Sequence, residues 1–128
     1  MDPLFLTLEE VLVIHESRIR RYGGRSGIRD IGLLQSAVGT VGATFAGTFL
    51  HTTLFEMAAA YLFHICRNHP FVDGNKRTAL ACALAFLHLN GVTVEAEPDD
   101  LYELVMRVAS GAAGKSDVAV FLRSHAAG

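Results

Sequence analysis

The sequence predicts an all-α protein, a compact bundle of about six helices packed around two central ones. Residues 54–68 and 75–89 are apolar on nearly all sides, which is typical of helices buried at the centre of a bundle. Elsewhere apolar residues recur near the helical period, and turn-forming residues separate these stretches. The chain has 128 residues, 51% of them hydrophobic, so we expect one domain, residues 1–128, that folds without disulfides.

The first two helices are predicted by the residues that begin and end them. Thr7, with Glu10 three residues later, forms a capping box for a helix over residues 7–21, and a pair of glycines follows it. Asp30 can cap a second helix. The residues expected to face inward from that helix are Leu33, Leu34, Ala37, Val38 and Val41.

The next part of the chain contains the two central helices. Residues 42–51 are rich in Gly, Thr and Phe and do not indicate one particular element. Residues 54–68 and 75–89 follow as the central helices, and Asn90 with Gly91 ends the second of them.

The last part of the chain predicts two further helices. Residues 92–96 are a candidate for a short extended segment. Pro98 suits the first turn of a fifth helix that runs to about residue 110, where Gly111 follows. Ser116 is expected to cap a last helix that ends near His125.

Composition and charge exclude several classes of function. The formal net charge of −2 gives no general nucleic-acid footprint, so we expect no direct nucleic-acid partner. The N-terminus lacks a basic region before an apolar run, and no apolar stretch approaches the about 20 residues that span a membrane. Cys66 and Cys82 lie among apolar residues and are expected to be buried and reduced. These features predict a cytoplasmic protein with no membrane partner.

One segment breaks the apolar pattern between the two central helices. Residues 69–77 begin with His69 and end with Lys76 and Arg77, and Arg67 lies just before them. A loop that joins core helices needs turn-forming residues, and the Pro, Asp, Gly and Asn of this segment supply them. It does not need a histidine and three cations as well, so we expect the segment to carry the chemistry.

The positions of the cations predict a phosphate-binding site, which we call the phosphate cradle. Lys76 and Arg77 fall in the first turn of a helix, where unpaired N–H groups already present positive partial charge. Each cation there costs about 0.3–1 kcal/mol, but the same end becomes favourable when an anion binds. Gly74 lets the backbone approach the anion closely. The alternative is that both cations extend into solvent or pair with acidic residues.

Two further residues fit this site. Asp73 is a hard oxygen ligand that suits Mg²⁺ held between one carboxylate and substrate phosphates, although its role could be confined to shaping the turn. His69 is the group best placed to accept a proton near neutral pH. We interpret the other histidines as packing or surface residues without charged neighbours: His15, His51, His64, His88 and His125.

The pattern His69-x-Phe71-x-Asp73-Gly74-Asn75-Lys76-Arg77-Thr78-Ala79 resembles the signature of the Fic/Doc superfamily, specifically its Doc toxin branch. The segments 21–24, 27–30, 33–37 and 86–92 are also similar to that branch, so the resemblance covers most of the chain. It implies the all-α Fic/Doc fold.

The sequence departs from the wider Fic pattern at two positions. Lys76 replaces a glycine, and Leu80 stands where Fic adenylyltransferases have a last arginine that could clamp a phosphate through two hydrogen bonds. Doc-like enzymes share both changes. The resemblance therefore implies transfer of the γ-phosphoryl group of ATP to a hydroxyl of elongation factor Tu, which halts translation.

The resemblance also implies a role for each residue of the motif. His69 would be the general base and Asp73 the Mg²⁺ ligand. The residues expected to contact the phosphates of ATP are Arg67, Gly74, Asn75, Lys76 and Arg77. Phe71 would anchor the loop to the core, and Pro70 would shape it. The expected partners are elongation factor Tu as substrate and a Phd-like antitoxin whose disordered segment folds on binding.

Three other interpretations stay open at this point. The same residues could transfer AMP, as in Fic-type adenylyltransferases. The chain could be a catalytically idle binding module with the Fic fold, although the intact motif argues against that. A nucleic-acid-binding helical protein is suggested by Arg18, Arg20, Arg21, Arg25 and Arg29, but the negative net charge argues against it.

Overall fold

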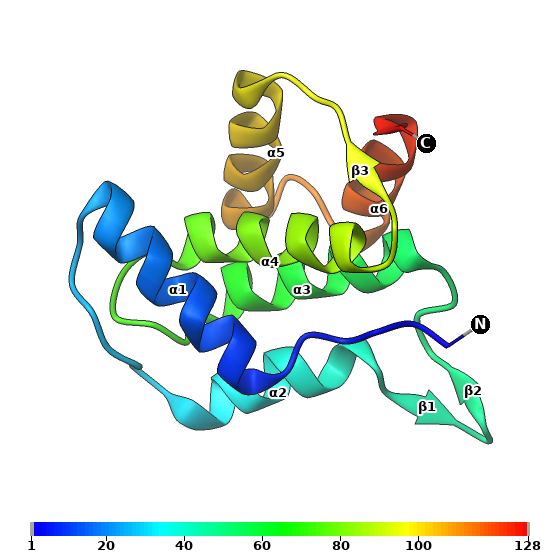
Figure 1. The fold of residues 1–128 in the computed structure, drawn as a ribbon, viewed down its shortest axis with the longest axis horizontal. Coiled ribbons are helices and arrows are strands. Elements are labelled where there is room, and N and C mark those ends of the chain that lie inside the picture. The colour runs from blue at the N-terminus through cyan, green and yellow to red at the C-terminus, as the bar shows by residue number, and fades with distance from the viewer. Residues whose placement is uncertain (1, 128) are drawn as a thin grey trace.

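The computed structural model describes residues 2–127 and confirms the all-α fold class (Figure 1). The described residues form six helices: α1 (Leu8–Tyr22), α2 (Ile31–Val41), α3 (Leu54–Asn68), α4 (Asn75–Leu89), α5 (Pro98–Ser110) and α6 (Lys115–Ser124). Four strands of two residues each complete the elements: β1 (Thr44–Phe45), β2 (Thr48–Phe49), β3 (Thr93–Val94) and β4 (Ala126–Ala127).

Helices α3 and α4 form the centre of the bundle, as their all-round apolar sequences predict. They lie side by side in Figure 1, α2 and α6 pack against α3, and α1 packs against α4. Helix α5 contacts both central helices. The largest fully buried side chains of α3 and α4 are Tyr61, Leu62, Ile65, Phe86 and Leu87. Burial of this apolar surface is the main favourable contribution to folding, and it holds the α3–α4 connection in a fixed place.

The predicted caps of α1 and α2 are present. The Thr7 hydroxyl accepts a hydrogen bond from the Glu10 N–H at 3.1 Å, and the Glu10 carboxylate accepts one from the Thr7 N–H at 2.9 Å. The Asp30 carboxylate accepts a hydrogen bond from the Leu33 N–H at 3.0 Å. Each cap satisfies N–H groups that the helix itself leaves unpaired.

The prediction that Ser116 caps the last helix is wrong. Helix α6 begins at Lys115 with Gly114 at the cap position. The carboxylate of Asp117 accepts a hydrogen bond from the Gly114 N–H at 2.8 Å. Because the carboxylate of the third helical residue already reaches back to the cap, the helix begins two residues earlier than the serine indicates.

The two segments that the sequence left open form short antiparallel pairs. Residues 42–51 contain the hairpin of β1 and β2, in which Ala46 and Gly47 at the turn have positive φ. Strand β3 falls within the predicted extended segment and pairs with β4, directly after α6. The α6 end near His125 and the α5 bounds agree with the prediction.

The two cysteines behave as core residues. Cys66 and Cys82 are buried and free. Burial raises the pKa of the Cys66 thiol and raises that of Cys82 to about 12, so both thiols stay protonated at neutral pH. Separately, none of the helices described is both long and apolar enough to cross a membrane.

Candidate active site

The loop between α3 and α4 packs against the core through one side chain and is hydrogen-bonded to residues 27–30. Phe71 is only 1% exposed, which confirms its predicted role as the anchor of the loop. The N–H groups of Arg29 and Asp30 donate to the Pro70 carbonyl at 2.8 and 3.1 Å, and Val72 N–H donates to the Gly27 carbonyl at 3.0 Å. Residues 27–30 therefore hold the outer edge of the loop.

Asn75 fixes the shape of the loop from within. Its side-chain oxygen accepts a hydrogen bond from the Phe71 N–H at 2.9 Å, and its side-chain nitrogen donates to the Phe71 carbonyl at 3.0 Å. These two bonds use one donor and one acceptor of the amide group that the sequence assigns to phosphate binding. The Asn75 side chain therefore holds the loop in place, and its contact with a phosphate stays a prediction.

The Asp73 carboxylate is exposed and held in one orientation by backbone donors. One oxygen accepts from the Arg25 N–H at 3.2 Å, and the other accepts from the Gly74 N–H at 3.0 Å. These two hydrogen bonds, that of Arg25 first, lower the pKa of Asp73, and the nearby Arg77 acts in the same direction. The carboxylate is therefore ionised at neutral pH. One ionised, solvent-facing carboxylate beside a phosphate site fits Mg²⁺, which retains several waters and needs few protein ligands.

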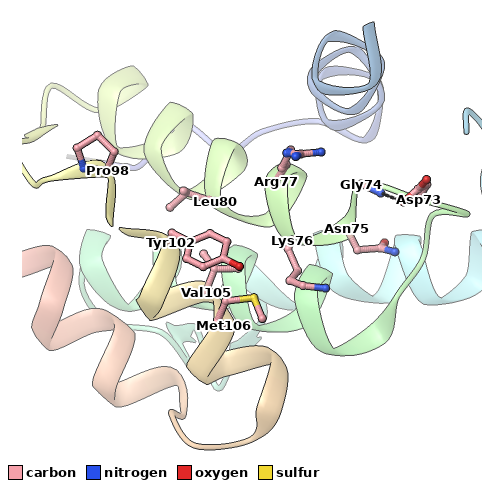
Figure 2. A pocket seen from close by; sticks show the side chains of 10 residues that line it. All are labelled: Asp73, Gly74, Asn75, Lys76, Arg77, Leu80, Pro98, Tyr102, Val105 and Met106. Carbon is pink, nitrogen blue, oxygen red and sulfur yellow. Dashed lines mark hydrogen bonds between the residues drawn. The ribbon is translucent and has the colours of Figure 1, made fainter. Parts of the chain in front are cut away.

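The first turn of α4 has no side-chain cap. Gly74 occupies the cap position with φ of +76°, and no side chain accepts a hydrogen bond there. Lys76 and Arg77 follow at once, both exposed, and leave the turn in different directions (Figure 2). Arg77 carries its guanidinium over the Tyr22 ring of α1, 4.8 Å from the ring centroid. Free N–H donors with two cations beside them fit an anion such as a phosphate.

A cleft of about 440 Å³ opens between this turn and α5. Its lining includes the predicted residues Asp73, Gly74, Asn75, Lys76 and Arg77, together with Leu80. Helix α5 forms the opposite wall, where Tyr102, Val105 and Met106 face the side chain of Leu80 (Figure 2). This wall could not be predicted from the sequence, because the pattern of residues 98–110 indicates only an amphipathic helix.

His69 lies at the other end of the loop and does not line this cleft. It is exposed and has a left-handed backbone with φ of +48° at the C-terminus of α3. A residue other than glycine in this conformation is strained, and such residues cluster at functional sites. The guanidinium of Arg29 donates to the carbonyl of His69 at 2.6 Å and to that of Asn68 at 2.9 Å. Arg29, which the sequence indicates only as part of a basic group, therefore secures this conformation.

Arg67 lies away from the cradle. Its guanidinium donates to the carbonyls of Val108 and Ala109, each at 3.3 Å, and so binds the C-terminal end of α5. Arg67 is not among the residues that line the cleft. Arg67 thus makes a contact that a cation commonly makes with the last carbonyls of a helix, and its contact with a phosphate stays a prediction.

Three of the other histidines have neighbours that the sequence did not indicate. His15 is 4% exposed, and its Nε2 lies 2.8 Å from the carbonyl oxygen of Asp73. His51 and His64 both direct Nε2 at the Lys115 ammonium, at 3.3 and 3.2 Å. The interpretation as a packing residue is confirmed for His15, which is buried against Phe71. The expectation of no charged neighbours is wrong for His51 and His64, because the fold brings Lys115 to both.

The described chain is thus a helical protein in which an uncapped, cationic helix start meets an ionised carboxylate at a cleft. The chain belongs to the Fic/DOC family, whose sequence model matches residues 5–87. It is 44% identical to "Protein kinase doc" of Escherichia phage P1 over 115 residues, which cover 90% of each chain. It is also 49% identical to "Toxin Doc" of Mycolicibacterium smegmatis over 78 residues, 61% of this chain and 60% of the relative. These findings confirm the resemblance to the Doc branch.

Gly24 offers a direct test of what holds the Asp73 carboxylate. A Cβ atom at Gly24 would lie 2.9 Å from Asp73 Oδ2. We expect Gly24→Ala to push the carboxylate away from the Arg25 N–H and to raise the pKa of Asp73 toward its ordinary value, because a lost hydrogen bond no longer favours the charged form. The measurement is an NMR titration of the Asp73 carboxyl.

Gly23 provides the matched control for this substitution. It also has positive φ, +83° against +112° at Gly24, but a Cβ there would meet nothing within 4 Å. Gly23→Ala therefore adds backbone strain of a similar kind and should leave the pKa of Asp73 unchanged. Equal pKa values for Asp73 in the two variants would contradict the assigned contact.

Proposed function

We propose that this chain is the toxin of a toxin–antitoxin pair and transfers the γ-phosphoryl group of ATP to a hydroxyl of a translation factor. The observation that carries the proposal is the pair Lys76 and Arg77 on the uncapped start of α4, beside Asp73. The family and the relative named a protein kinase support phosphoryl transfer as the reaction. Elongation factor Tu is the acceptor that the Doc resemblance implies, which would place the reaction in the cytoplasm.

The proposed transfer has one bond forming and one breaking. The hydroxyl oxygen of the acceptor bonds to the γ-phosphorus, and the bond from that phosphorus to the β–γ bridging oxygen breaks, so that ADP leaves. His69 accepts the proton of the hydroxyl at an imidazole nitrogen. Its exposed position at the end of α3 leaves it accessible to a protein acceptor.

The cradle offsets negative charge during this transfer. The N–H groups of the first turn of α4 and the side chains of Lys76 and Arg77 would hold the phosphates and stabilise charge on their oxygens. Asp73 would hold Mg²⁺, which neutralises phosphate charge when bound. Asn75 and Arg29 would act indirectly, since their hydrogen bonds fix the loop that carries these groups.

The proposed inhibitor is a separate, Phd-like antitoxin. Its disordered segment would fold into an amphipathic helix on an apolar surface of this bundle. A groove of about 450 Å³ between α1 and α4 has the apolar lining that such a helix requires, and Val13 and Leu89 are exposed on it. This groove supports the proposal of a helical partner.

Expression of the chain in a bacterial host tests the toxin assignment. Expressed alone, the chain should arrest growth and protein synthesis, and co-expression of its antitoxin should restore both. The control is His69→Ala, which should permit growth without the antitoxin. Normal growth with high levels of the folded, unmodified chain would contradict the toxin assignment.

A further inference from the structure

A buried histidine of α1 contacts the backbone of the candidate active site from behind. His15 is 4% exposed, and its ring is stacked on that of Phe71 with centroids 3.8 Å apart and planes 5° apart. Its Nε2 lies 2.8 Å from the carbonyl oxygen of Asp73. The same side chain thus contacts the anchor of the loop and the residue proposed to hold Mg²⁺.

The hydrogen bond determines which way the Asp73–Gly74 peptide faces. A carbonyl oxygen only accepts, so His15 Nε2 must carry the proton and donate it. In a trans peptide the N–H points away from the C=O, so the Gly74 N–H faces outward, where it donates to the Asp73 carboxylate at 3.0 Å. The bond from His15 to one side of this peptide therefore orients the donor that holds the carboxylate on the other side.

The fit of Gly74 against α1 gives this peptide little freedom. A Cβ at Gly74 would lie 3.0 Å from Cδ1 of Ile19 and 3.7 Å from Nε2 of His15. Gly74 is also the cap residue of α4, with φ of +76°. The peptide that His15 contacts is thus the junction between the Asp73 carboxylate and the phosphate cradle.

We propose that His15 is a positioning residue for the Mg²⁺ and phosphate site, acting through the Asp73–Gly74 peptide. This inference rests on the proposed function, because it concerns the same site. Side chains that orient a metal ligand without touching the metal change affinity for the metal by about 10–100-fold when they are replaced. Without the donor, the Asp73 carbonyl would face the interior unpaired, and the peptide would lose the hydrogen bond that favours its present orientation.

Two variants separate the hydrogen bond from the packing of the ring. The amide nitrogen of glutamine is the same number of bonds from Cα as Nε2 of histidine, so His15→Gln keeps the donor and loses the stacking on Phe71. His15→Phe keeps an aromatic ring against Phe71 and loses the donor. If His15 served only to pack, His15→Phe would preserve both the Tm and the affinity for Mn²⁺ better than His15→Gln.

The experiment measures the dissociation constant for Mn²⁺ in the presence of ATP by electron paramagnetic resonance, along with Tm. We expect His15→Phe to fold with a Tm somewhat below that of the parent, because the Asp73 carbonyl is left unpaired, and to weaken Mn²⁺ binding by about 10–100-fold. His15→Gln should have the lower Tm of the two and the tighter Mn²⁺ binding. His88→Phe is the control for loss of an imidazole, since His88 is exposed near the end of α4, and it should change neither quantity.

The outcomes distinguish failure of this inference from failure of the proposed function. Parent-like Mn²⁺ binding by His15→Phe, or weaker binding by His15→Gln than by His15→Phe, overturns the positioning role alone. Lack of Mn²⁺ binding by the parent chain with ATP overturns the proposed function and the inference with it. If His15→Phe does not fold, the comparison is His15→Gln with His15→Asn, whose donor lies one bond closer to Cα, and equal Mn²⁺ binding by these two overturns the role.

Discussion

His69→Ala is expected to fold like the parent chain and to lose transfer activity by about 10²–10⁴-fold, the usual contribution of a general base. The fold should survive because the side chain is exposed. The backbone of residue 69 is left-handed, and alanine is no better suited to this conformation than histidine, so the local strain stays similar. The measurement is the initial rate of label transfer from ATP, with circular dichroism as the test of folding.

Two further variants make the His69 result specific. His69→Asn tolerates the left-handed backbone but lacks a basic nitrogen, so it should be as inactive as His69→Ala. His88→Ala removes an exposed histidine near the far end of α4 and should keep full activity. A folded His69→Ala protein with near-normal activity would exclude His69 as the general base.

The sequence predicts the helices of this protein well, because local signals determine them. The bounds of α3 and α4 match the prediction at both ends, since long apolar stretches are interrupted there by turn-forming residues. The prediction for Ser116 was wrong because a serine side chain is only one of the groups that can hydrogen-bond at the start of a helix. Here the Asp117 carboxylate, within the helix, accepts from the Gly114 N–H. The pairing of β3 with β4 joins segments about 30 residues apart, and a two-residue strand has no pattern that identifies its partner.

The site was predicted from the sequence only in part. Residues 73–77 are contiguous, so one turn brings them together whatever the rest of the chain does. Arg29 and His15 act on the loop across 40 and 58 residues of sequence, and their identity alone gives no sign of these contacts. Arg67 is close to the motif in sequence, but its side chain leaves α3 toward α5. Position along the chain is therefore a poor guide to which cation reaches the cradle.

Whether the site transfers a phosphoryl group or AMP depends on which phosphorus of the bound nucleotide faces the acceptor hydroxyl. Lys76 occupies the position of a glycine in the Fic pattern that the resemblance associates with AMP transfer, and it adds volume and charge at the exposed start of α4. Leu80 lines the cleft at the position of an arginine in the Fic pattern, opposite Tyr102 and Val105 of α5 (Figure 2). Both residues argue against a nucleotide position further into the cleft, in which the α-phosphorus would face the acceptor hydroxyl. The nucleotide would then bind with its γ-phosphorus toward the acceptor hydroxyl.

Lys76→Gly tests the contribution of the Lys76 side chain to phosphoryl transfer. The variant should transfer the γ-phosphoryl group more slowly, since it loses one of the two cations of the cradle. AMP transfer is not expected to become efficient, because Leu80 still provides no clamp for the position further into the cleft. Lys115→Gly would be a poor control, since Lys115 contacts two histidines, so the matched control is Arg20→Gly on the exposed surface of α1.

The most direct measurement uses two preparations of ATP, one labelled at the α-phosphorus and one at the γ-phosphorus. Each is incubated with the unmodified chain, Mg²⁺ and elongation factor Tu, and the acceptor is then examined for label and for its change in mass. We expect the acceptor to gain the γ label, no α label, and the mass of one phosphoryl group. Transfer of the α label with the mass of AMP would contradict this expectation and would identify the chain as an adenylyltransferase.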